Sequence, residues 1–382
     1  MANKKKAPFI ESFDLTRWKE APFLMLKGFL MGSADIVPGV SGGTMALITG
    51  IYDRLIFAIK SINLTAISHI LRFRLRLLFE QIHWKFFLLL GLGMVLAIIF
   101  FTRVVPLQIY MFTHPEIVYG LFFGLILGSI VLLMREVNSN ERNWTNIFPL
   151  AAGTLFGFWV VNLVPGDTPE HFWFVFLTGS IAISAMVLPG ISGSYILLIF
   201  NKYDYILTQL SYLGTPNTLE GFINLIPFGL GMIVGIAAFS RLLSWLLKKY
   251  RTITITVLIG FLLGSLYVIW PFQERQYYET VTNIEILEAT DPVVVQLLQN
   301  GIESNRPEYL RIGQVIHSNG ENHTAQMVEV ETVSRKIISN KPFNPWSPEF
   351  RGAEDINKRE GVIGVLLGLM MIIGISYLRK KG

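Results

Sequence analysis

The sequence predicts an all-α polytopic membrane protein with inverted-topology repeats, each a re-entrant broken-helix pair plus two transmembrane helices, and a small extracytoplasmic domain. Three observations predict this fold. Of the 382 residues, 52% are hydrophobic and the mean hydropathy is +0.50, which is more apolar than a soluble core requires. The motif from Gly32 to Asp53, GSADIVPGVSGGTMALITGIYD, returns in diverged form 151 positions later. Lys and Arg gather in alternate short loops between apolar segments.

The two copies of the motif share ten positions, which indicates a gene duplication. In the first copy these are Gly28, Ser33, Ala34, Pro38, Gly39, Ser41, Gly42, Leu47, Tyr52 and Asp53, and in the second Gly179, Ser184, Ala185, Pro189, Gly190, Ser192, Gly193, Leu198, Tyr203 and Asp204. Proline removes an amide donor and pushes the preceding residue out of helix, so we expect helix breaks at Pro38 and Gly39 and at Pro189 and Gly190. The apolar run before the first break would span about 21 Å as helix, too short for a hydrocarbon core of about 30 Å. Each pair is therefore expected to enter the membrane and turn back.

The predicted segments follow from the apolar runs and the charges between them. In chain order they are a basic N-terminus at 1–20, a re-entrant pair at 21–60, helices at 86–105 and 116–134, a linking helix at 145–164, a second re-entrant pair at 172–207, helices at 222–247 and 253–272, an extracytoplasmic domain at 273–360 and a last helix at 361–378. Repeat 1 is thus 21–134 and repeat 2 is 172–272.

This topology gives basic short loops on one side of the membrane and short loops without Lys or Arg on the other. It places both termini in the cytoplasm and predicts a multi-pass protein of a bacterial plasma membrane. No signal peptide is visible at the N-terminus. An odd number of spans separates the two copies, so they enter from opposite faces.

The duplication extends beyond the broken pairs. At an offset of 138, matching residues are Gly91, Leu92, Gly93, Met94, Phe101, Thr102 and Arg103 with Gly229, Leu230, Gly231, Met232, Phe239, Ser240 and Arg241. At an offset of 136, Gly124, Leu127, Gly128 and Ser129 match Gly260, Leu263, Gly264 and Ser265. Small residues at these places let neighbouring helices approach closely.

The segment 273–360 differs in composition from the rest of the chain. It has 14 acidic and 9 basic residues, short apolar runs such as Val293 to Leu298, and the stretch KPFNPWSPEF. An α/β fold is one candidate for it. It carries no catalytic signature, and its partner is not indicated by the sequence.

The two breaks are the first candidate site, for an anion. Helices that begin after the glycines present free N–H groups, and nearby hydroxyls add donors. The candidate phosphate-binding residues of the breaks are Ser41, Gly42, Gly43, Thr44, Ser192, Gly193 and Ser194. The alternative is that the breaks are kinks with glycines for packing. Whether the two breaks face each other depends on packing that the sequence does not specify.

Two arginines within predicted spans complete the candidate phosphate site. Arg103 and Arg241 hold equivalent places in the two repeats, and a guanidinium suits bidentate phosphate binding. The alternative is that both snorkel from the ends of their helices.

Asp35 is a candidate for ion coupling, because it is the one acid in the entering half of the first pair and its counterpart is Met186. Capping a helix or pairing with an arginine are the alternatives. We interpret Asp53 and Asp204, with their neighbours Arg54 and Lys202, mainly as interface anchors.

Enzyme signatures are missing from the sequence. There are no cysteines, and the six histidines, His69, His83, His114, His171, His317 and His323, form no metal-binding pattern. No Gly-x-Ser-x-Gly elbow or Walker-type loop occurs. We therefore expect no catalytic residues, no metal, no cofactor and no nucleic-acid partner, and the basic residues point to membrane orientation.

With these residues in place, the chain resembles the polyprenyl-phosphate (undecaprenyl-phosphate) transporter family, long described as a membrane family of unknown function. The resemblance rests on GSADIVPGVSGGTMALITGIYDRLI and AISAMVLPGISGSYILLIFNKYD and covers residues 20–272 and the last helix. It implies return of the lipid carrier from the outer to the inner leaflet after cell-wall assembly, with the polyprenyl phosphate and membrane lipids as partners. The segment 273–360 departs from the family pattern.

Two other functions stay open at this point. One is secondary transport of a small soluble anion or ion through the same broken helices. The other is a membrane scaffold that acts through its extracytoplasmic domain. The oligomeric state is not indicated.

Overall fold

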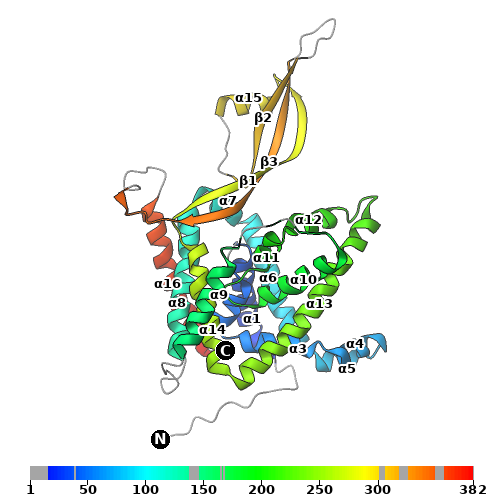
Figure 1. Cartoon of the computed structure of the whole chain (residues 1–382), viewed down its shortest axis with the longest axis vertical. Helices are drawn as coiled ribbons and strands as arrows, with labels where there is room; N and C mark the ends of the chain where they lie inside the picture. The colour runs from blue at the N-terminus through cyan, green and yellow to red at the C-terminus, as the bar shows by residue number, and fades with distance from the viewer. Residues whose placement is uncertain are drawn as a thin grey trace. The chain divides into compact units, whose positions relative to one another are not determined.

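The computed structural model describes residues 16–37, 40–136, 146–163, 166, 168–300, 306–317, 326–348 and 357–381. The chain forms two compact units (Figure 1). The first contains Met1–Val105, Phe122–Ile269 and Val365–Gly382, and the second contains Pro106–Leu121 and Trp270–Gly364. The two units are described separately below.

The first broken element consists of α1 (Ala21–Asp35), α2 (Gly42–Ile48) and α3 (Tyr52–Ser61). Helix α1 has 15 residues, about 22 Å at 1.5 Å per residue, so it ends short of a full crossing as expected. Helices α2 and α3 are bent by 119° relative to each other. The predicted break residues Pro38 and Gly39 lie outside the described residues.

The second broken element repeats this order with α10 (Phe172–Val187), α11 (Gly193–Ile199) and α12 (Tyr203–Ser211). Pro189 and Gly190 lie between α10 and α11, where a break was predicted. Gly50, between α2 and α3, and Asn201, between α11 and α12, both have a positive φ, of 75° and 49°. These two residues are separated by the same 151 positions as the motifs, and glycine and asparagine are the residues that tolerate this conformation best. The backbone of the motif is therefore repeated as well as its sequence.

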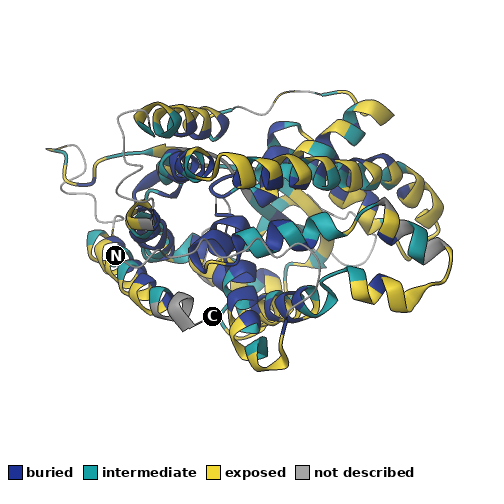
Figure 2. Ribbon diagram, turned by 90° about the horizontal axis from the view of Figure 1, so that it is seen from below, coloured by how far each residue is buried: buried dark blue, intermediate teal, exposed yellow. Residues whose placement is uncertain are grey.

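Five helices are long and apolar enough to cross a membrane, among the residues described. They are α6 (Trp84–Arg103), α8 (Pro115–Glu136), α13 (Thr218–Lys249), α14 (Arg251–Ile269) and α16 (Lys358–Lys381). The linking segment predicted at 145–164 contains α9 (Ile147–Val160), whose 14 residues are shorter than a full crossing. The long helices have both buried and exposed faces (Figure 2), and many large apolar side chains of α6 and α13 are exposed.

Glycines set the helix contacts, and they do so in the same way in both repeats. Helix α1 packs on α6 and α10 packs on α13, with so little space that a Cβ would overlap a backbone carbonyl. The four contacts, first repeat then second, are Gly28 to Leu90 and Gly179 to Phe228, then Gly93 to Met25 and Gly231 to Phe176. Every residue in these contacts has its partner at the offset of 151 or 138. The internal repeat is thus visible in the packing, while the opposite orientation of its copies stays a prediction.

Two further helices take equivalent places. Gly260 of α14 meets the carbonyl of Leu150 in α9, and Gly124 of α8 meets the carbonyl of Val365 in α16. Since Gly124 and Gly260 match at the offset of 136, α16 covers α8 as α9 covers α14. Each repeat is therefore covered by the helix that follows the other repeat in the sequence.

Several short elements lie where the sequence predicted only loops. The loop at 61–85 contains α4 (Leu64–Leu71) and α5 (Leu75–Gln81). In the second unit, the loop at 106–115 contains α7 (Leu107–Thr113). A single 3-10 turn, η1 (Trp18–Glu20), precedes α1.

The second unit contains a three-stranded antiparallel sheet in the order β1, β3, β2. The strands are β1 (Gln273–Glu288), β2 (Glu308–His317) and β3 (Gln326–Pro342), and α15 (Pro292–Asn300) follows β1. Val294 of α15 is fully buried against Val328 and Val330 of β3, so α15 covers part of one face. The chain is mostly helical with one small sheet.

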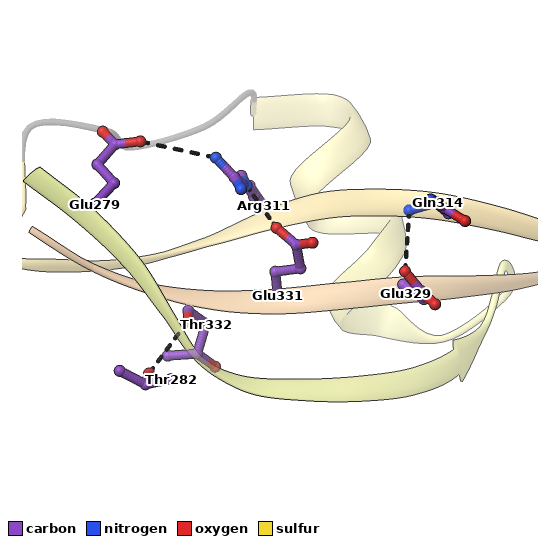
Figure 3. A network of polar contacts seen from close by, with 7 residues as sticks. All are labelled: Glu279, Thr282, Arg311, Gln314, Glu329, Glu331 and Thr332. Carbon is purple, nitrogen blue, oxygen red and sulfur yellow. Dashed lines mark hydrogen bonds and ion pairs between the residues drawn. The ribbon is translucent and has the colours of Figure 1, made fainter.

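A polar network occupies the other face of this sheet (Figure 3). Arg311 and Glu331 are direct neighbours across β2 and β3, with Nε and Oε2 2.6 Å apart. Glu279 of β1 lies 3.7 Å from Arg311 and 2.9 Å from Arg335, so it connects all three strands. Partly exposed pairs of this kind contribute about 0–1 kcal/mol each, and their effect here is mainly to fix the register.

Substitution of Gly231 tests the repeated packing. In Gly231→Ala the new Cβ overlaps the carbonyl of Phe176, and we expect a loss of about 1–3 kcal/mol, seen as a lower melting temperature in detergent. The matched control is Gly229→Ala in the same helix, where a Cβ meets nothing within 4 Å, and alanine should stabilise by up to about 1 kcal/mol. The first repeat should show the same contrast, with Gly93→Ala less stable and Gly91→Ala unaffected or more stable. Equal melting temperatures within either pair would contradict this packing.

Candidate functional site

The end of α10 depends on the first broken element for its hydrogen bonds. Helix α10 stops at Val187, because Leu188 precedes proline and leaves the helical conformation, with ψ at 131°. The last carbonyls of a helix have no partner within it. Ser41 Oγ donates to Met186 O at 3.2 Å and to Leu188 O at 3.3 Å. The phenol of Tyr52, which begins α3, donates to Val187 O at 3.2 Å.

The amide of Gly190, within the second break, also has its partner in the first broken element. Gly190 N donates to Thr44 Oγ1 at 2.9 Å, and Thr44 is fully buried. Gly190 has a φ of 81°, and a Cβ there would lie 2.8 Å from the carbonyl oxygen of Phe261, so only glycine fits. A Cβ at Gly43 would lie 2.6 Å from Val187 O. The two broken elements therefore meet at one place in the structure.

Asp35 caps the helix that follows the first break. Its Oδ1 accepts a hydrogen bond from Gly42 N at 2.6 Å, while Ser41 Oγ accepts from Gly43 N at 3.1 Å. A Cβ at Gly42 would lie 2.6 Å from Asp35 Oδ2, which leaves glycine as the residue that fits. Of the roles considered for Asp35, capping is thus the one observed. A carboxylate of the chain itself occupies this end of α2.

The corresponding place in the second element carries no such group. The counterpart of Asp35 is Met186, and Ser192 Oγ and Ser194 Oγ lie 2.8 Å apart and bind each other. Ser194 is exposed and Ser192 partly so, whereas Ser41 and Thr44 are buried. Of the four candidate hydroxyls, these two can accept a ligand without first giving up a backbone contact.

Both predicted arginines lie on exposed helix surface. Arg103 is the last residue of α6 and is exposed. Arg241 is exposed on α13, and its Nη1 donates to Ala237 O of the same helix at 2.6 Å. Within the described residues, neither forms a hydrogen bond or an ion pair with the breaks, and their phosphate role stays a prediction.

The predicted anchors are held by ion pairs and rings. Asp53 Oδ2 lies 2.7 Å from Arg251 Nη1, and Arg54 Nη1 lies 3.0 Å from Glu20 Oε2. Lys202 is 1% exposed, and its Nζ donates to Thr168 O at 3.0 Å. A lysine this deeply buried does not reach water as an interface anchor would. The rings of Phe174 and Tyr205, each 5.7 Å from Nζ, lie where water would otherwise contact the charge.

Tyr52 is the site residue for which the sequence assigned no role. It is 2% exposed, and its hydroxyl contacts the second break from a distance of 135 residues along the chain. A signal was present, because Tyr52 and Tyr203 are one of the ten matched pairs. No group of three or more His, Cys, Asp or Glu side chains able to hold a metal ion occurs in the described part of the chain.

These features define a multi-pass membrane protein with two broken helical elements in contact, in which side chains of the first satisfy backbone groups of the second. The chain belongs to the undecaprenyl phosphate translocase-like family, whose profile matches residues 31–286. That match includes both breaks and ends within β1, so most of the sheet lies outside it.

Two curated relatives each match 65% of this chain. A polyprenyl-phosphate transporter of Vibrio cholerae serotype O1 is 39% identical over 249 residues, which is 65% of this chain and 77% of the relative. A polyprenyl-phosphate transporter of Staphylococcus aureus is 31% identical over 261 residues, 65% of this chain and 85% of the relative. No solved structure matches the chain.

Thr44→Val tests the contact between the two breaks. Valine keeps the shape of threonine but leaves the buried Gly190 N–H without its acceptor, and we expect a loss of about 1–3 kcal/mol. Melting temperature in detergent is the measurement. Thr49→Val is the control, because Thr49 Oγ1 donates to Met45 O, a carbonyl that keeps the amide of residue 49 as its partner. If both variants melt at the same temperature, the Thr44 contact does not hold the two breaks together.

Proposed function

We propose that this protein moves undecaprenyl phosphate, or a similar polyprenyl phosphate, from the outer to the inner leaflet of the bacterial plasma membrane. Family membership and the names of the two relatives support the lipid substrate. The direction, the flippase mechanism and the coupling to an ion are our proposals. A polyprenyl phosphate has one anionic head and a long apolar tail, so its carrier needs a polar site within the membrane and a lateral opening to lipid.

The observation that carries this proposal is the contact between the two breaks. Intramembrane backbone without its helical hydrogen bonds is tolerated only inside protein or beside a polar cavity. Discontinuous helices that meet near the midplane are where secondary transporters bind their substrates. Here Ser41, Thr44 and Tyr52 bring the two breaks together.

The contacts are asymmetric, which supports alternating exposure. In a symmetric arrangement, Ser192 and Tyr195, the counterparts of Ser41 and Thr44, would bind the first break. Instead Ser192 binds Ser194, and the Tyr195 hydroxyl donates to Val161 O at 2.8 Å. We infer that the structure is one of two states, and that exchange of these two sets of contacts opens the site to the other leaflet.

In this mechanism the phosphate head first contacts the hydroxyls of Ser192 and Ser194, which among the described residues bind only each other, and the amide of Gly193. Ser41, Gly42, Gly43 and Thr44 take the equivalent role once their contacts open. Arg103 and Arg241 attract the phosphate from the membrane surface at either end of the path, while the isoprenoid tail stays in the bilayer.

A transport assay tests the site. Movement of undecaprenyl phosphate across the leaflets of proteoliposomes should fall roughly tenfold to a hundredfold in Arg241→Ala and Arg103→Ala, the range of a lost hydrogen bond to a charged group of about 1.5–3 kcal/mol. Ser194→Ala should slow it less, because the serine hydroxyl that donates to the phosphate is neutral, whereas a guanidinium is charged. Arg135→Ala is the control, since Arg135, like Arg103, is an exposed arginine in the last turn of a long helix.

The outcomes of this assay separate the rival functions. Wild-type protein that moves no lipid, with or without a proton or sodium gradient, would contradict our proposal. Uptake of a soluble anion that lipid phosphate does not inhibit would instead support the soluble-anion carrier. Protein that moves neither would favour the scaffold.

Asp35→Asn tests proton coupling. Asparagine keeps an oxygen that can accept from Gly42 N, so the fold should persist, but it cannot bind or release a proton. We expect lipid movement that no longer responds to an imposed pH gradient, measured in the same proteoliposomes. A variant that responds as strongly as wild type would show that Asp35 only caps α2.

A further inference from the structure

Helices α4 and α5 form a hairpin between the first broken element and α6 (Figure 1). With eight and seven residues, about 12 and 10 Å long, neither can cross a hydrocarbon core of about 30 Å. The base of the hairpin is closed, because Gln81 Nε2 donates to Asn63 Oδ1 at 2.8 Å and to Ser61 O at 3.3 Å. Asn63 Oδ1 also accepts from Thr65 N at 2.9 Å, at the start of α4. The hairpin is therefore a defined unit and not a loose loop.

Large apolar side chains project from the turn and from α5. Phe73 is 88% exposed, Leu75 54% and Phe79 50%, while only Leu78 of α5 is buried. Leaving such a side chain in water forgoes about 1.5–3 kcal/mol relative to burying it. Three of them on so short a segment indicate a surface that is covered in the native setting.

Arginines alternate with these apolar residues. Arg72, Arg74 and Arg76 are exposed, and Glu80, which pairs with Arg76 at 3.1 Å, is the one acid among residues 72–80. The segment thus carries three positive charges against one negative. Exposed aromatic and aliphatic side chains mixed with arginines are typical of helices that lie in the headgroup layer of an anionic membrane.

Aromatic contacts fix the level of the hairpin relative to a membrane-crossing helix. The ring of Phe79 contacts that of Trp84, the first residue of α6, with centroids 5.8 Å apart. Trp18 lies 6.3 Å from Trp84, and Lys85 Nζ lies 5.7 Å from the Trp84 ring. Tryptophan beside lysine at the end of a transmembrane helix marks the headgroup level. Helix α5 is attached at that level.

We propose that the α4–α5 hairpin is a binding surface for anionic phospholipid headgroups. Phe73, Leu75 and Phe79 insert at the boundary of the acyl chains, and the arginines contact lipid phosphates. This surface is separate from the breaks and does not depend on the transported substrate. It holds the segment that connects α3 to α6 at the membrane surface while the broken elements move.

The absence of cysteine from the chain allows a direct test. The full-length variant Phe73→Cys, labelled with an environment-sensitive fluorophore, is reconstituted in vesicles of phosphatidylcholine with or without phosphatidylglycerol. Nitroxide lipids labelled near the headgroup or deep in the chain report depth. Ile284→Cys, 56% exposed on β1, is the matched control outside the predicted membrane region.

We expect shallow nitroxides to quench the label at position 73 more strongly than deep ones, and the control label to stay unquenched. Replacing Arg72, Arg74 and Arg76 by Gln in the same background should lower the lipid-bound fraction in phosphatidylglycerol vesicles, by roughly fivefold per arginine when binding is not saturated. Wild-type and triple variant should match in pure phosphatidylcholine.

Three results would overturn the proposal. A label at position 73 as accessible to water as the control shows that the hairpin does not bind lipid. Lipid quenching that changes neither with phosphatidylglycerol nor on replacement of the arginines shows an apolar anchor without headgroup recognition. Protection from aqueous iodide without lipid quenching shows that protein covers the surface.

Discussion

The structure depends on the backbone groups that are released where its central helices break. In a low-dielectric surrounding, each unpaired buried N–H or C=O is unfavourable by about 1–3 kcal/mol, and no water is at hand to replace the partner. The chain meets this constraint with side chains of the other repeat: Ser41 and Tyr52 bind the carbonyls that end α10, and Thr44 binds the amide of Gly190. The same hydrogen bonds therefore satisfy the backbone of the break and join the two elements.

The two copies of one motif have acquired different chemistry at a single aligned position. Asp35 provides a carboxylate that caps α2, and Met186 provides none for α11. At the first break the helix end is capped by the carboxylate of Asp35, while the second break presents two hydroxyls. A site with one self-capped end and one free end is suited to a cycle in which the ligand and the cap compete, and this is the physical basis of the proposed proton coupling.

Much of the helical architecture could be predicted from the sequence, because its signals are local. Pro189 ends α10, apolar runs give α6 and α14, and the matched glycines predict close helix contacts, whose partners the structure identifies as α1 with α6 and α10 with α13. Helices α4, α5 and α7 were missed because segments of seven or eight residues carry too little periodicity. A sheet was expected within an α/β fold of the segment 273–360, but its strands and their order could not be predicted, because the pairing joins residues about 50 positions apart and β1 has no strict alternation.

The candidate site could be predicted in position but not in detail. The spacing of the motifs located both breaks, yet only packing shows that they meet. Asp35 as cap and Asp35 as proton site require the same residue, so the sequence left both open. The direction of a long side chain is likewise not encoded by spacing, and Arg241 turns back to the carbonyl of Ala237.

The packing of α8 on a helix that follows the second repeat has a consequence for biosynthesis. Gly124 of α8 meets Val365 of α16, and the two residues are 241 positions apart in the sequence (365 − 124). At about 5–20 residues per second, the ribosome needs roughly 10–50 s to bridge that gap. During this time the glycine stripe of α8 has only lipid or a chaperone against it. The first repeat is therefore inserted before α8 has this packing partner, and the contact forms only after the second repeat has been synthesised.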